Sequence, residues 1–319
     1  MTKPNLDQAI SDYLRLRRAL GYQLRVQEIQ LRSFARFAAA RGHQGPVTRA
    51  LAEGWARDTR RPNPLTWAQR LGAVRPFARY LASTDPRTEV PPPRSLGRSY
   101  PRTPPCVLTV VEVDQLMRAA EQLTPDRGLR AQTLATLVGL LACTGLRVSE
   151  ALRLRMADVD LQQGILGIRQ SKYGKSRLVP LHPTAVEALA RYGRQRDAIA
   201  PVTPDQRFFQ LAKGVPLTYS LTRTAFRRVR HLLGWDRRPG SPRANLRSLR
   251  HFFACQRLVA WYGQGDDVAG RIHALSTYLG HSKVTDTYWY LSGIPALLAI
   301  AAQRFRSLNG NAEDEPCRP

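Results

Sequence analysis

A proline- and arginine-rich segment, DPRTEVPPPRSLGRSYPRTPPC (residues 85–106), divides this chain into two unequal parts. Proline fixes its own φ angle and lacks a backbone N–H, so such a stretch continues neither a helix nor a central strand. Apolar periodicity is missing from this segment and present on both sides of it. The sequence therefore predicts two folded domains, residues 1–85 and 108–308, joined by an extended linker at residues 86–107. A chain of 319 residues is long enough for two domains of ordinary size.

Residues 1–85 are predicted to form a bundle of four short helices. Apolar residues at positions 6–14 repeat at three- and four-residue spacing, which places them on one face of a helix. A second helix is expected over residues 29–38, a third that begins near Thr48 as its N-cap, and a fourth over residues 65–81. Four helices of this length can close a small bundle around one core.

Residues 108–308 also have a mostly helical pattern, with one exception. Two short β-prone runs, 164–169 and 176–181, flank the glycine-containing turn QSKYGK at residues 170–175, and this arrangement predicts a β-hairpin. The polar tail, residues 309–319, is expected to be disordered. The expected fold class is therefore mainly α with a small β-hairpin or sheet, in which a helical N-terminal domain precedes a mixed α+β domain.

The charge balance indicates the kind of partner that this chain binds. Lys and Arg total 49 against 24 Asp and Glu, and the formal net charge is +25. Such a charge repels itself in a compact chain and favours a polyanionic partner, with nucleic acid as the first candidate and an anionic membrane as the second. A GC-rich genome explains the preference for Arg over Lys, but not the twofold excess of basic residues. No basic amphipathic helix with exposed aromatic residues stands out, so DNA is the expected partner and a membrane is not.

The cysteines and the apolar runs indicate an intracellular protein. Cys106, Cys143, Cys255 and Cys317 are far apart and lack the spacing of a zinc site, so we expect ordinary reduced thiols. The N-terminus has no apolar signal-peptide core, and no apolar run approaches the roughly 20 residues that span a bilayer. We therefore expect a soluble, cytoplasmic protein that associates with the nucleoid when it binds DNA.

The first candidate site is the segment TGLRVSE, where an apolar helix ends at Thr144–Gly145 and a new helix begins. Arg147 is expected in the first turn of the new helix, where backbone N–H groups favour anions and a guanidinium can grip two phosphate oxygens. Glu150 lies one turn further on and is placed to orient Arg147. On its own, this pattern also fits an ordinary surface Arg–Glu pair.

The second candidate is the predicted hairpin turn, which contains Lys172 and Lys175. A lysine held near a phosphate can act as a general acid toward a leaving alkoxide. Taken alone, two lysines in a turn more commonly mark a solvated loop.

The third candidate is RSLRHFF, in which Arg247 and Arg250 are three residues apart and share one face of a predicted helix. The adjacent His251 points about 100° around that helix from Arg250, so we do not expect it to act in place of another residue. A DNA-facing basic helix without chemistry is the plainer interpretation of this segment.

The fourth candidate is GHSKVTDTYWY, in which His281 precedes Tyr288 and Tyr290. A single histidine after glycine is usually structural, and a Tyr-Trp-Tyr run usually belongs to a core or an interface. Neither residue type identifies a site by itself.

Together and in this order, the four segments resemble the catalytic domain of the tyrosine recombinase (phage integrase) family, over about residues 108–300. TGLRVSEALRL resembles the family's first arginine box, at Arg147. SKYGKSRLVPL resembles its lysine hairpin, which places the catalytic lysine at Lys172. RSLRHFF resembles its His-x-x-Arg box, which places the second arginine at Arg250.

The segment LGHSKVTDTYWY resembles the family's terminal box. In the family, this box contains the nucleophile. The family's tyrosine follows the histidine by nine residues, and nine residues after His281 is Tyr290, with Tyr288 as the less favoured candidate. The N-terminal helices resemble the family's core-binding domain in position, size and helicity.

One position departs from the family's pattern. The His-x-x-Arg box begins with Arg247 instead of histidine. Arginine stays protonated near neutral pH, so this residue can hold a phosphate but cannot act as a base.

The resemblance implies transesterification at phosphorus. Tyr290 attacks the scissile phosphate, forms a 3′-phosphotyrosine and frees a 5′-hydroxyl. Arg147 and Arg250, assisted by the arginine at the head of the box, stabilise the charge of the transition state. His281 is the hydrogen-bond partner or base for the phenol, and Lys172 is the acid for the leaving oxygen.

No cofactor and no metal are expected. The phosphotyrosine conserves the energy of the broken bond, so no ATP is needed, and the sequence has no GxxxxGK[ST] phosphate loop. Clustered carboxylates that would hold two metal ions are also missing.

The resemblance further implies four protomers on two double-stranded DNA sites, as a homo- or hetero-tetramer with or without companion recombinases. Residues 295–305 have the pattern of an amphipathic helix that either docks on a neighbouring protomer or packs within its own chain. The expected function is site-specific recombination for integration, excision or transposition of a mobile element. A type IB topoisomerase-like relaxation activity and a non-catalytic DNA-binding relative are the two alternatives.

Overall fold

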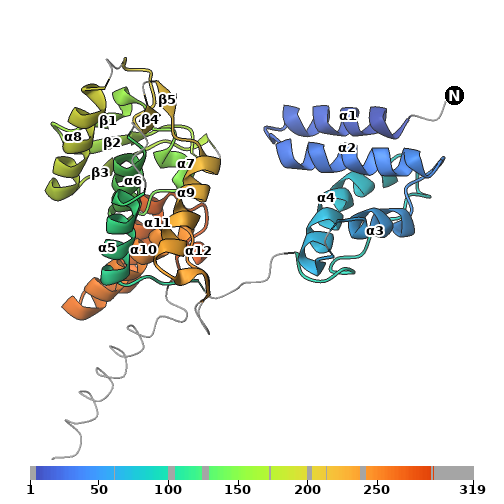
Figure 1. Ribbon diagram of the computed structural model, residues 1–319. Helices are drawn as coiled ribbons and strands as arrows, with labels where there is room; N and C mark the ends of the chain where they lie inside the picture. Colours follow the sequence, from blue (N-terminus) through green and yellow to red (C-terminus); the bar gives the residue numbers. More distant parts are fainter. Residues whose placement is uncertain are drawn as a thin grey trace, which may run out of the picture. The chain divides into compact units, whose positions relative to one another are not determined.

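The computed structural model describes residues 5–60, 62–99, 105–123, 129–171, 174–199, 203–212, 214–237, 242–288 and 290. The chain forms two compact units, Met1–Thr103 and Pro104–Pro319 (Figure 1). The expected helix at 295–305 and the expected disordered tail at 309–319 lie outside the described residues.

The first unit contains a bundle of four helices, as the fold class predicts. Their bounds are α1 Leu6–Ala19, α2 Arg25–Ala40, α3 Arg49–Arg57 and α4 Pro64–Ala82 (Figure 1). Thr48 caps α3 by accepting from a backbone N–H, as the sequence predicts, and Asn63 caps α4 in the same way. The apolar faces meet in a core that includes Phe34, Trp55 and Phe77, each almost completely buried.

Residues 85–99 differ from the extended linker that their proline content predicts, because they pack against the first unit. Arg75 donates to the carbonyl oxygens of Pro91 and Pro92, both at 2.9 Å. Leu96 is buried and belongs to the core of the bundle. Proline removes a donor but keeps its carbonyl acceptor, and these acceptors make the contacts. The composition therefore indicates correctly that the segment is not helical. It does not reveal that the segment packs against the helices of the bundle.

The second unit is mainly helical with two small sheets, which confirms the predicted fold class. Its helices are α5 Val110–Glu121, α6 Arg130–Thr144, α7 Val148–Ala151, α8 Pro183–Asp197, α9 Tyr219–Leu232, α10 Leu246–Gln264, α11 Val268–Leu279 and α12 Thr285–Tyr288, with 3-10 helices η1 Met156–Asp158 and η3 Trp235–Arg237. Helix α6 is central, because it contacts α5, α8, α9 and α10 as well as the strand β4 Gln210–Ala212 (Figure 1).

The predicted hairpin is present in a three-stranded antiparallel sheet of order β1-β2-β3. The strands are β1 Val159–Asp160, β2 Ile165–Ile168 and β3 Arg177–Pro180. Ile168 pairs with Arg177 at the end of the ladder nearest the turn. A second antiparallel pair, β4 Gln210–Ala212 and β5 Val215–Pro216, was not predicted, because strands of two or three residues are too short to show periodicity.

The C-terminal end of α6 packs closely against α10. Gly145 caps α6 with a φ of 61°, and a Cβ at this position would lie 2.5 Å from Cδ1 of Phe253. Glycine alone suits both the left-handed backbone and the short approach. This contact brings the segment after α6 next to the first half of α10, which are the two segments where the sequence predicts phosphate-binding arginines.

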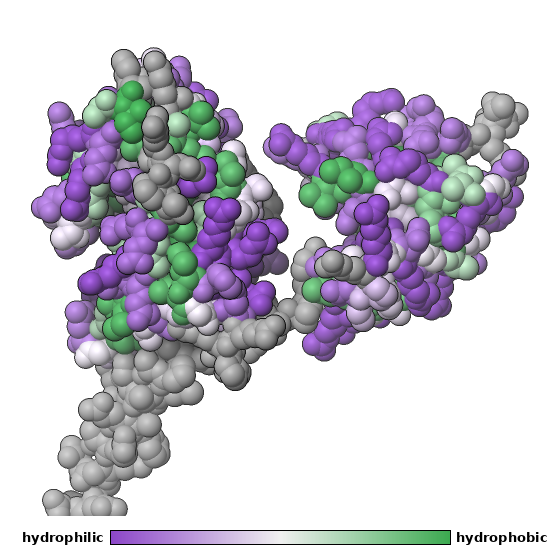
Figure 2. Space-filling model, in the orientation of Figure 1, coloured by the Kyte–Doolittle hydropathy of each residue, from purple (hydrophilic) through white to green (hydrophobic). Residues whose placement is uncertain are grey.

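The visible face of both units is mostly hydrophilic, with small apolar patches (Figure 2). Within the described ranges, no helix has both the length and the apolar character that a membrane crossing requires.

Candidate active site

Arg147 lies at the N-cap of the short helix α7, one position before the first turn in which the sequence places it. Its Nη1 donates to Oε1 of Glu150 at 2.7 Å and to Oγ of Ser171 at 3.2 Å, and its Nη2 donates to the carbonyl oxygen of Gly280 at 2.8 Å. The side chain is 25% exposed. A guanidinium has five N–H donors, so these three contacts fix its plane and leave capacity for an anion.

Glu150 is the buried centre of this network. Its carboxylate is 1% exposed and accepts from Arg147, from the hydroxyl of Ser171 and from both terminal nitrogens of Arg177. Burial alone would raise the pKa of Glu150, but the hydrogen bonds from Arg177 and Ser171, together with the charge of Arg177, hold the pKa at about 2. Glu150 is thus a fixed anion to which two guanidinium groups are attached.

Arg250 is buried on α10, whereas Arg247, one turn earlier, is exposed. Arg250 donates from Nη1 to the carbonyl oxygen of Gly145 and from Nη2 to that of Leu279, both at 2.8 Å. Burial lowers the pKa of Arg250, the neighbouring Tyr290 opposes this shift, and the charge of Arg147 adds to it. The two arginines of the box therefore have different environments, and Arg250 is the one held inside the site.

His281 directly follows the glycine that ends α11. Its Nδ1 is 2.7 Å from the hydroxyl of Thr287, which is fully buried. Burial lowers the pKa of His281 to about 4, the charges of Arg250 and Arg147 act in the same direction, and Asp286 opposes them. The imidazole is therefore neutral near pH 7 and is able to accept a proton.

Tyr290 lies against this histidine and is 5% exposed. The rings of Tyr290 and His281 are nearly parallel, with centroids 6.0 Å apart and an interplanar angle of 21°. Tyr288 lies at the end of α12 and is 46% exposed. Of the two tyrosines, Tyr290 is the one that the structure places with Arg250 and His281.

His251 also contacts Tyr290, which the sequence analysis did not anticipate. The ring centroids are 5.2 Å apart and the planes meet at 66°, in an edge-to-face arrangement. Burial lowers the pKa of His251 to about 4, and the charges of Arg247 and Arg250 add to this shift. Its Nδ1 is buried and has no hydrogen-bond partner among the described residues. The spacing of Arg247 and His251, four residues on one helix, was the signal that could have indicated a shared face.

Lys172 lies outside the described residues, and so does residue 173. The residues on either side are described. Ser171 is buried and its backbone N–H donates to the carbonyl oxygen of Lys175 at 2.7 Å. Lys175 itself is exposed. Ser171, the residue before Lys172 in the chain, therefore lies next to Arg147 and Glu150.

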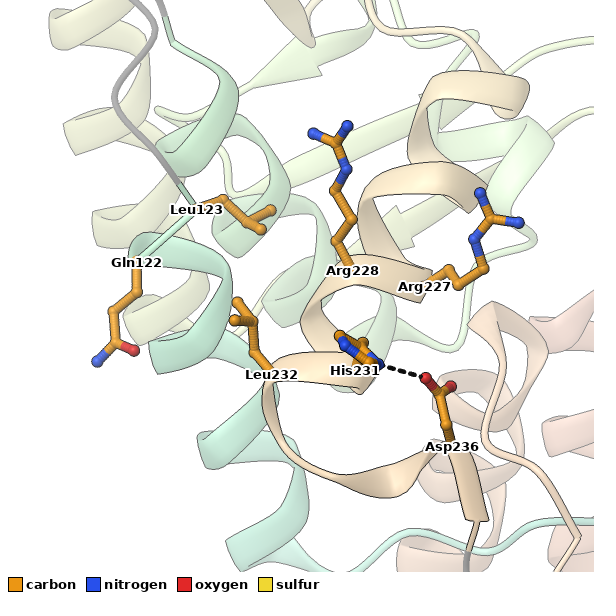
Figure 3. Close-up of a pocket in the computed structure, with 7 residues that line it drawn as sticks. All are labelled: Gln122, Leu123, Arg227, Arg228, His231, Leu232 and Asp236. Atoms are coloured by element: carbon orange, nitrogen blue, oxygen red, sulfur yellow. Dashed lines mark hydrogen bonds and ion pairs between the residues drawn. The ribbon is translucent and has the colours of Figure 1, made fainter.

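A shallow pocket elsewhere in the second unit contains none of these residues. It lies between the end of α5 and the end of α9, and is lined by Gln122, Leu123, Arg227, Arg228, His231, Leu232 and Asp236 (Figure 3). His231 and Asp236 form an ion pair at 2.9 Å whose histidine is 80% exposed. The residues of the predicted site are mostly buried, and the side chain of Arg147 is 25% exposed. Within the described part of the chain, no three His, Cys, Asp or Glu residues are grouped as metal ligands.

The second unit matches a known family. The model of the phage integrase family matches residues 107–293. A putative integrase/recombinase (y4rE) from Sinorhizobium fredii is 38% identical over 305 residues, which cover 94% of this chain and 95% of that protein. Tyrosine recombinase XerD from Caulobacter vibrioides is 32% identical over 236 residues, which cover 72% of this chain and 70% of that protein.

Solved structures share the fold at lower identity. The Tn1549 transposon integrase, in complex with transposon right end DNA, superimposes with a TM-score of 0.68 at 17% identity, over 96% of this chain and 100% of that one. The XerH site-specific recombinase, bound to a palindromic difH substrate, gives a TM-score of 0.61 at 19% identity, over 90% of this chain and 79% of that one.

Proposed function

Since this chain belongs to the phage integrase family and is a tyrosine-type site-specific recombinase, we propose that Tyr290 is the nucleophile with which it cleaves DNA. One observation carries this proposal. Tyr290 packs against His281 and is close enough to Arg250 to affect its pKa, although Arg250 comes from a separate segment of the chain. The phenol thus meets a fixed cation and a neutral imidazole, which are the two groups that an attacking tyrosine needs.

Arg147 and Arg250 stabilise the phosphate during attack. Negative charge spreads over the non-bridging oxygens in the transition state, and donors that are already fixed lower its energy most. Both guanidiniums are held by backbone carbonyl oxygens, and Arg147 is also held by Glu150. Arg247 is exposed on the same helix as Arg250 and supplies further positive charge to the phosphate backbone.

Two proton transfers accompany the reaction. The phenol oxygen of Tyr290 forms a bond to phosphorus and passes its proton to His281, whose Nδ1 is engaged by Thr287 and whose Nε2 is the remaining nitrogen. The bond from phosphorus to the 5′-oxygen breaks, and Lys172 protonates that oxygen. Rejoining reverses these steps with the 5′-hydroxyl of a partner strand, so the phosphodiester energy is retained and no nucleotide cofactor is consumed.

Both units take part in DNA binding. We assign residues 1–85 to a helical core-binding domain and residues 108–308 to the catalytic domain, a division supported by the two compact units and by the net charge of +25. The XerH and Tn1549 complexes contain DNA, and the second protein is a transposon integrase. We therefore assign to this chain the integration, excision or transposition of a mobile element, carried out by four protomers on two DNA sites.

A covalent trapping experiment tests this function. Duplexes that bind the protein are first selected from a randomised pool. The selected sequence is then made as a panel of nicked substrates. Cleavage of these substrates releases a short product that diffuses away, so the strand cannot be rejoined and the covalent adduct accumulates. The wild-type protein and Tyr288→Phe are expected to give a protein–DNA adduct on a denaturing gel, whereas Tyr290→Phe gives none. A protein that binds the selected DNA but never forms an adduct would be the non-catalytic relative.

A further inference from the structure

The carbonyl oxygens at the C-terminal end of α11 all have partners, and three of the partners are arginines. The last carbonyls of a helix have no partner within the helix. Here the backbone N–H groups of Gly280 and His281 donate to the carbonyl oxygens of Thr277 and Ser276, both at 2.9 Å. The next three carbonyl oxygens in the chain accept from three separate guanidinium groups.

These three contacts have the same length. Arg177 donates from Nε to Tyr278, Arg250 from Nη2 to Leu279, and Arg147 from Nη2 to Gly280, each at 2.8 Å. The three arginines come from β3, α10 and the N-cap of α7. Positive groups at a helix C-terminus also meet the negative end of the helix dipole. We call this arrangement of Arg147, Arg177 and Arg250 the arginine clasp.

Gly280 permits the arginine clasp to close. It has a φ of 69°, and a Cβ at this position would lie 3.1 Å from Nη1 of Arg177 and 3.5 Å from Nη1 of Arg147. The side chain after this glycine is His281. The clasp therefore holds the C-terminal end of α11 in place, and with it the position of His281.

Arg177 joins Glu150 to the C-terminal end of α11. Besides Tyr278 it binds Glu150 through two parallel bonds, Nη2 to Oε2 at 2.8 Å and Nη1 to Oε1 at 3.2 Å. Its side chain is 14% exposed, against 25% for Arg147. The same carboxylate holds Arg147, so Arg177 is joined to one phosphate-binding arginine through Glu150 and to the histidine segment through Tyr278.

We propose that Arg177 is a positioning residue for DNA cleavage, which holds Arg147 and His281 in register with each other without contacting DNA. This inference rests on the proposed function, because it assigns a role relative to Arg147 and His281. Without Arg177, Glu150 keeps its contacts with Arg147 and Ser171, and Arg147 keeps its bond to Gly280, but the second connection from Glu150 to α11, through Tyr278, is lost. Fewer bonds then hold Arg147 and His281 relative to each other, and a misplacement of about 1 Å can slow catalysis roughly 100-fold.

The pH dependence of cleavage provides a readout that a purely structural residue would not change. The groups that act on His281 are Arg250, Arg147 and Arg177, which lower its pKa along with burial, and Asp286, which raises it; Thr287 and Tyr290 contact its ring. Removal of Arg177 takes away one of the lowering charges. The acidic limb of the cleavage profile should therefore move to higher pH.

The experiment compares Arg177→Met with Arg169→Met in single-turnover cleavage of the selected nicked duplex. Arg169 is a matched control, because it follows the strand residue that pairs with Arg177 and loses the same charge, but it is 71% exposed and pairs with Asp158. Arg177→Lys is the second variant, since lysine keeps the charge and cannot make two parallel bonds. DNA affinity, thermal midpoint and the cleavage rate across pH are measured for each protein.

We expect Arg177→Met to bind DNA within about threefold of the Arg169→Met control, to cleave it roughly 100-fold more slowly, and to shift the acidic limb upward. Arg177→Lys should be folded and should cleave slowly. This variant therefore tests the role of Arg177 if Arg177→Met does not fold. Cleavage by Arg177→Lys at the rate of the control would overturn the inference, as would a loss of DNA binding that accounts for the whole defect. A wild-type protein that forms no adduct would refute the proposed function instead, and this result is separate from either outcome.

Discussion

The imidazole of His251 lies edge to face against the phenol ring of Tyr290, with the ring centroids 5.2 Å apart. The box that contains His251 begins with an arginine at position 247, where the family's pattern has a histidine. Position 251 is one helical turn further along α10, so this chain has an imidazole on the same helix, beside Tyr290, the proposed nucleophile.

His251→Phe should make the protein more stable and less active. The buried Nδ1 has no partner among the described residues, and an unsatisfied buried nitrogen costs about 1–3 kcal/mol. Phenylalanine keeps the ring contact with Tyr290 and removes that cost, so the thermal midpoint should rise. Loss of the nitrogen should slow cleavage about tenfold or more. Single-turnover cleavage at equal DNA occupancy measures this, and an unchanged rate would limit His251 to packing.

Arg250 and Arg247 should respond very differently to lysine. Arg250 is buried and donates to two carbonyl oxygens that lysine cannot reach together, so Arg250→Lys should lower the cleavage rate by about 10²–10³. Arg247 is exposed, and Arg247→Lys keeps its charge, so its rate should fall by less than about tenfold. Cleavage rates measured on saturating DNA separate these effects from binding. Equal losses in both variants would contradict the environments described for the two residues.

Gly280→Ala should damage the site beyond its effect on the backbone. A left-handed conformation costs a non-glycine residue about 1–2 kcal/mol, and Gly280 has a φ of 69°. Gly234 has a φ of 68° and nothing within 4 Å of an added Cβ, so Gly234→Ala suffers the same strain without a clash. Both variants should lose similar stability in thermal unfolding, but only Gly280→Ala should lose cleavage activity. Full activity in a folded Gly280→Ala would show that the arginine clasp tolerates displacement.

The free energy of unfolding of the second unit should fall as the solution is acidified below about pH 6.5. His251 and His281 have folded pKa values of about 4 against an ordinary value of 6.5. Between these values the unfolded chain binds more protons, so stability is fully present above about pH 6.5 and is lost toward about pH 4. Glu150, with a pKa of about 2 against 4.5, adds a further loss below about pH 4.5.

Thermal midpoints measured between neutral pH and about pH 5 test this dependence. His251→Phe should show a shallower dependence than the wild-type protein, because one of the two buried imidazoles no longer titrates. A curve that is flat in the wild-type protein would contradict the burial of both histidines.

Local patterns predicted much of the fold. The four N-terminal helices follow from apolar spacing and from caps such as Thr48, and the β2–β3 hairpin follows from two short β-prone runs around a turn. The contacts of residues 85–99 were not predictable in this way, because Arg75 reaches the carbonyl oxygens of Pro91 and Pro92 from another segment. Backbone acceptors leave no mark in the sequence.

The same distinction between local patterns and long-range contacts applies to the residues of the candidate site. Residues that belong to motifs, such as Arg147, Arg250 and Tyr290, could be selected from spacing and resemblance. Arg177 and His251 could not, because their proposed roles come from contacts with Tyr278 and Tyr290. Tyr278 lies 101 residues after Arg177, and Tyr290 lies in a turn after α12. Gly280 was the one local signal, since a glycine directly before His281 permits the left-handed turn on which the arginine clasp depends.

The proposed role of Tyr290 is tested by identifying the residue that carries DNA in the trapped adduct. The adduct is digested with nuclease and trypsin, and the peptide that begins after Lys283 is sequenced by mass spectrometry, with fragment ions that separate Tyr288 from Tyr290. We expect a nucleotide phosphate on Tyr290 and an unmodified Tyr288. A phosphate on Tyr288, or on any other residue, would contradict it.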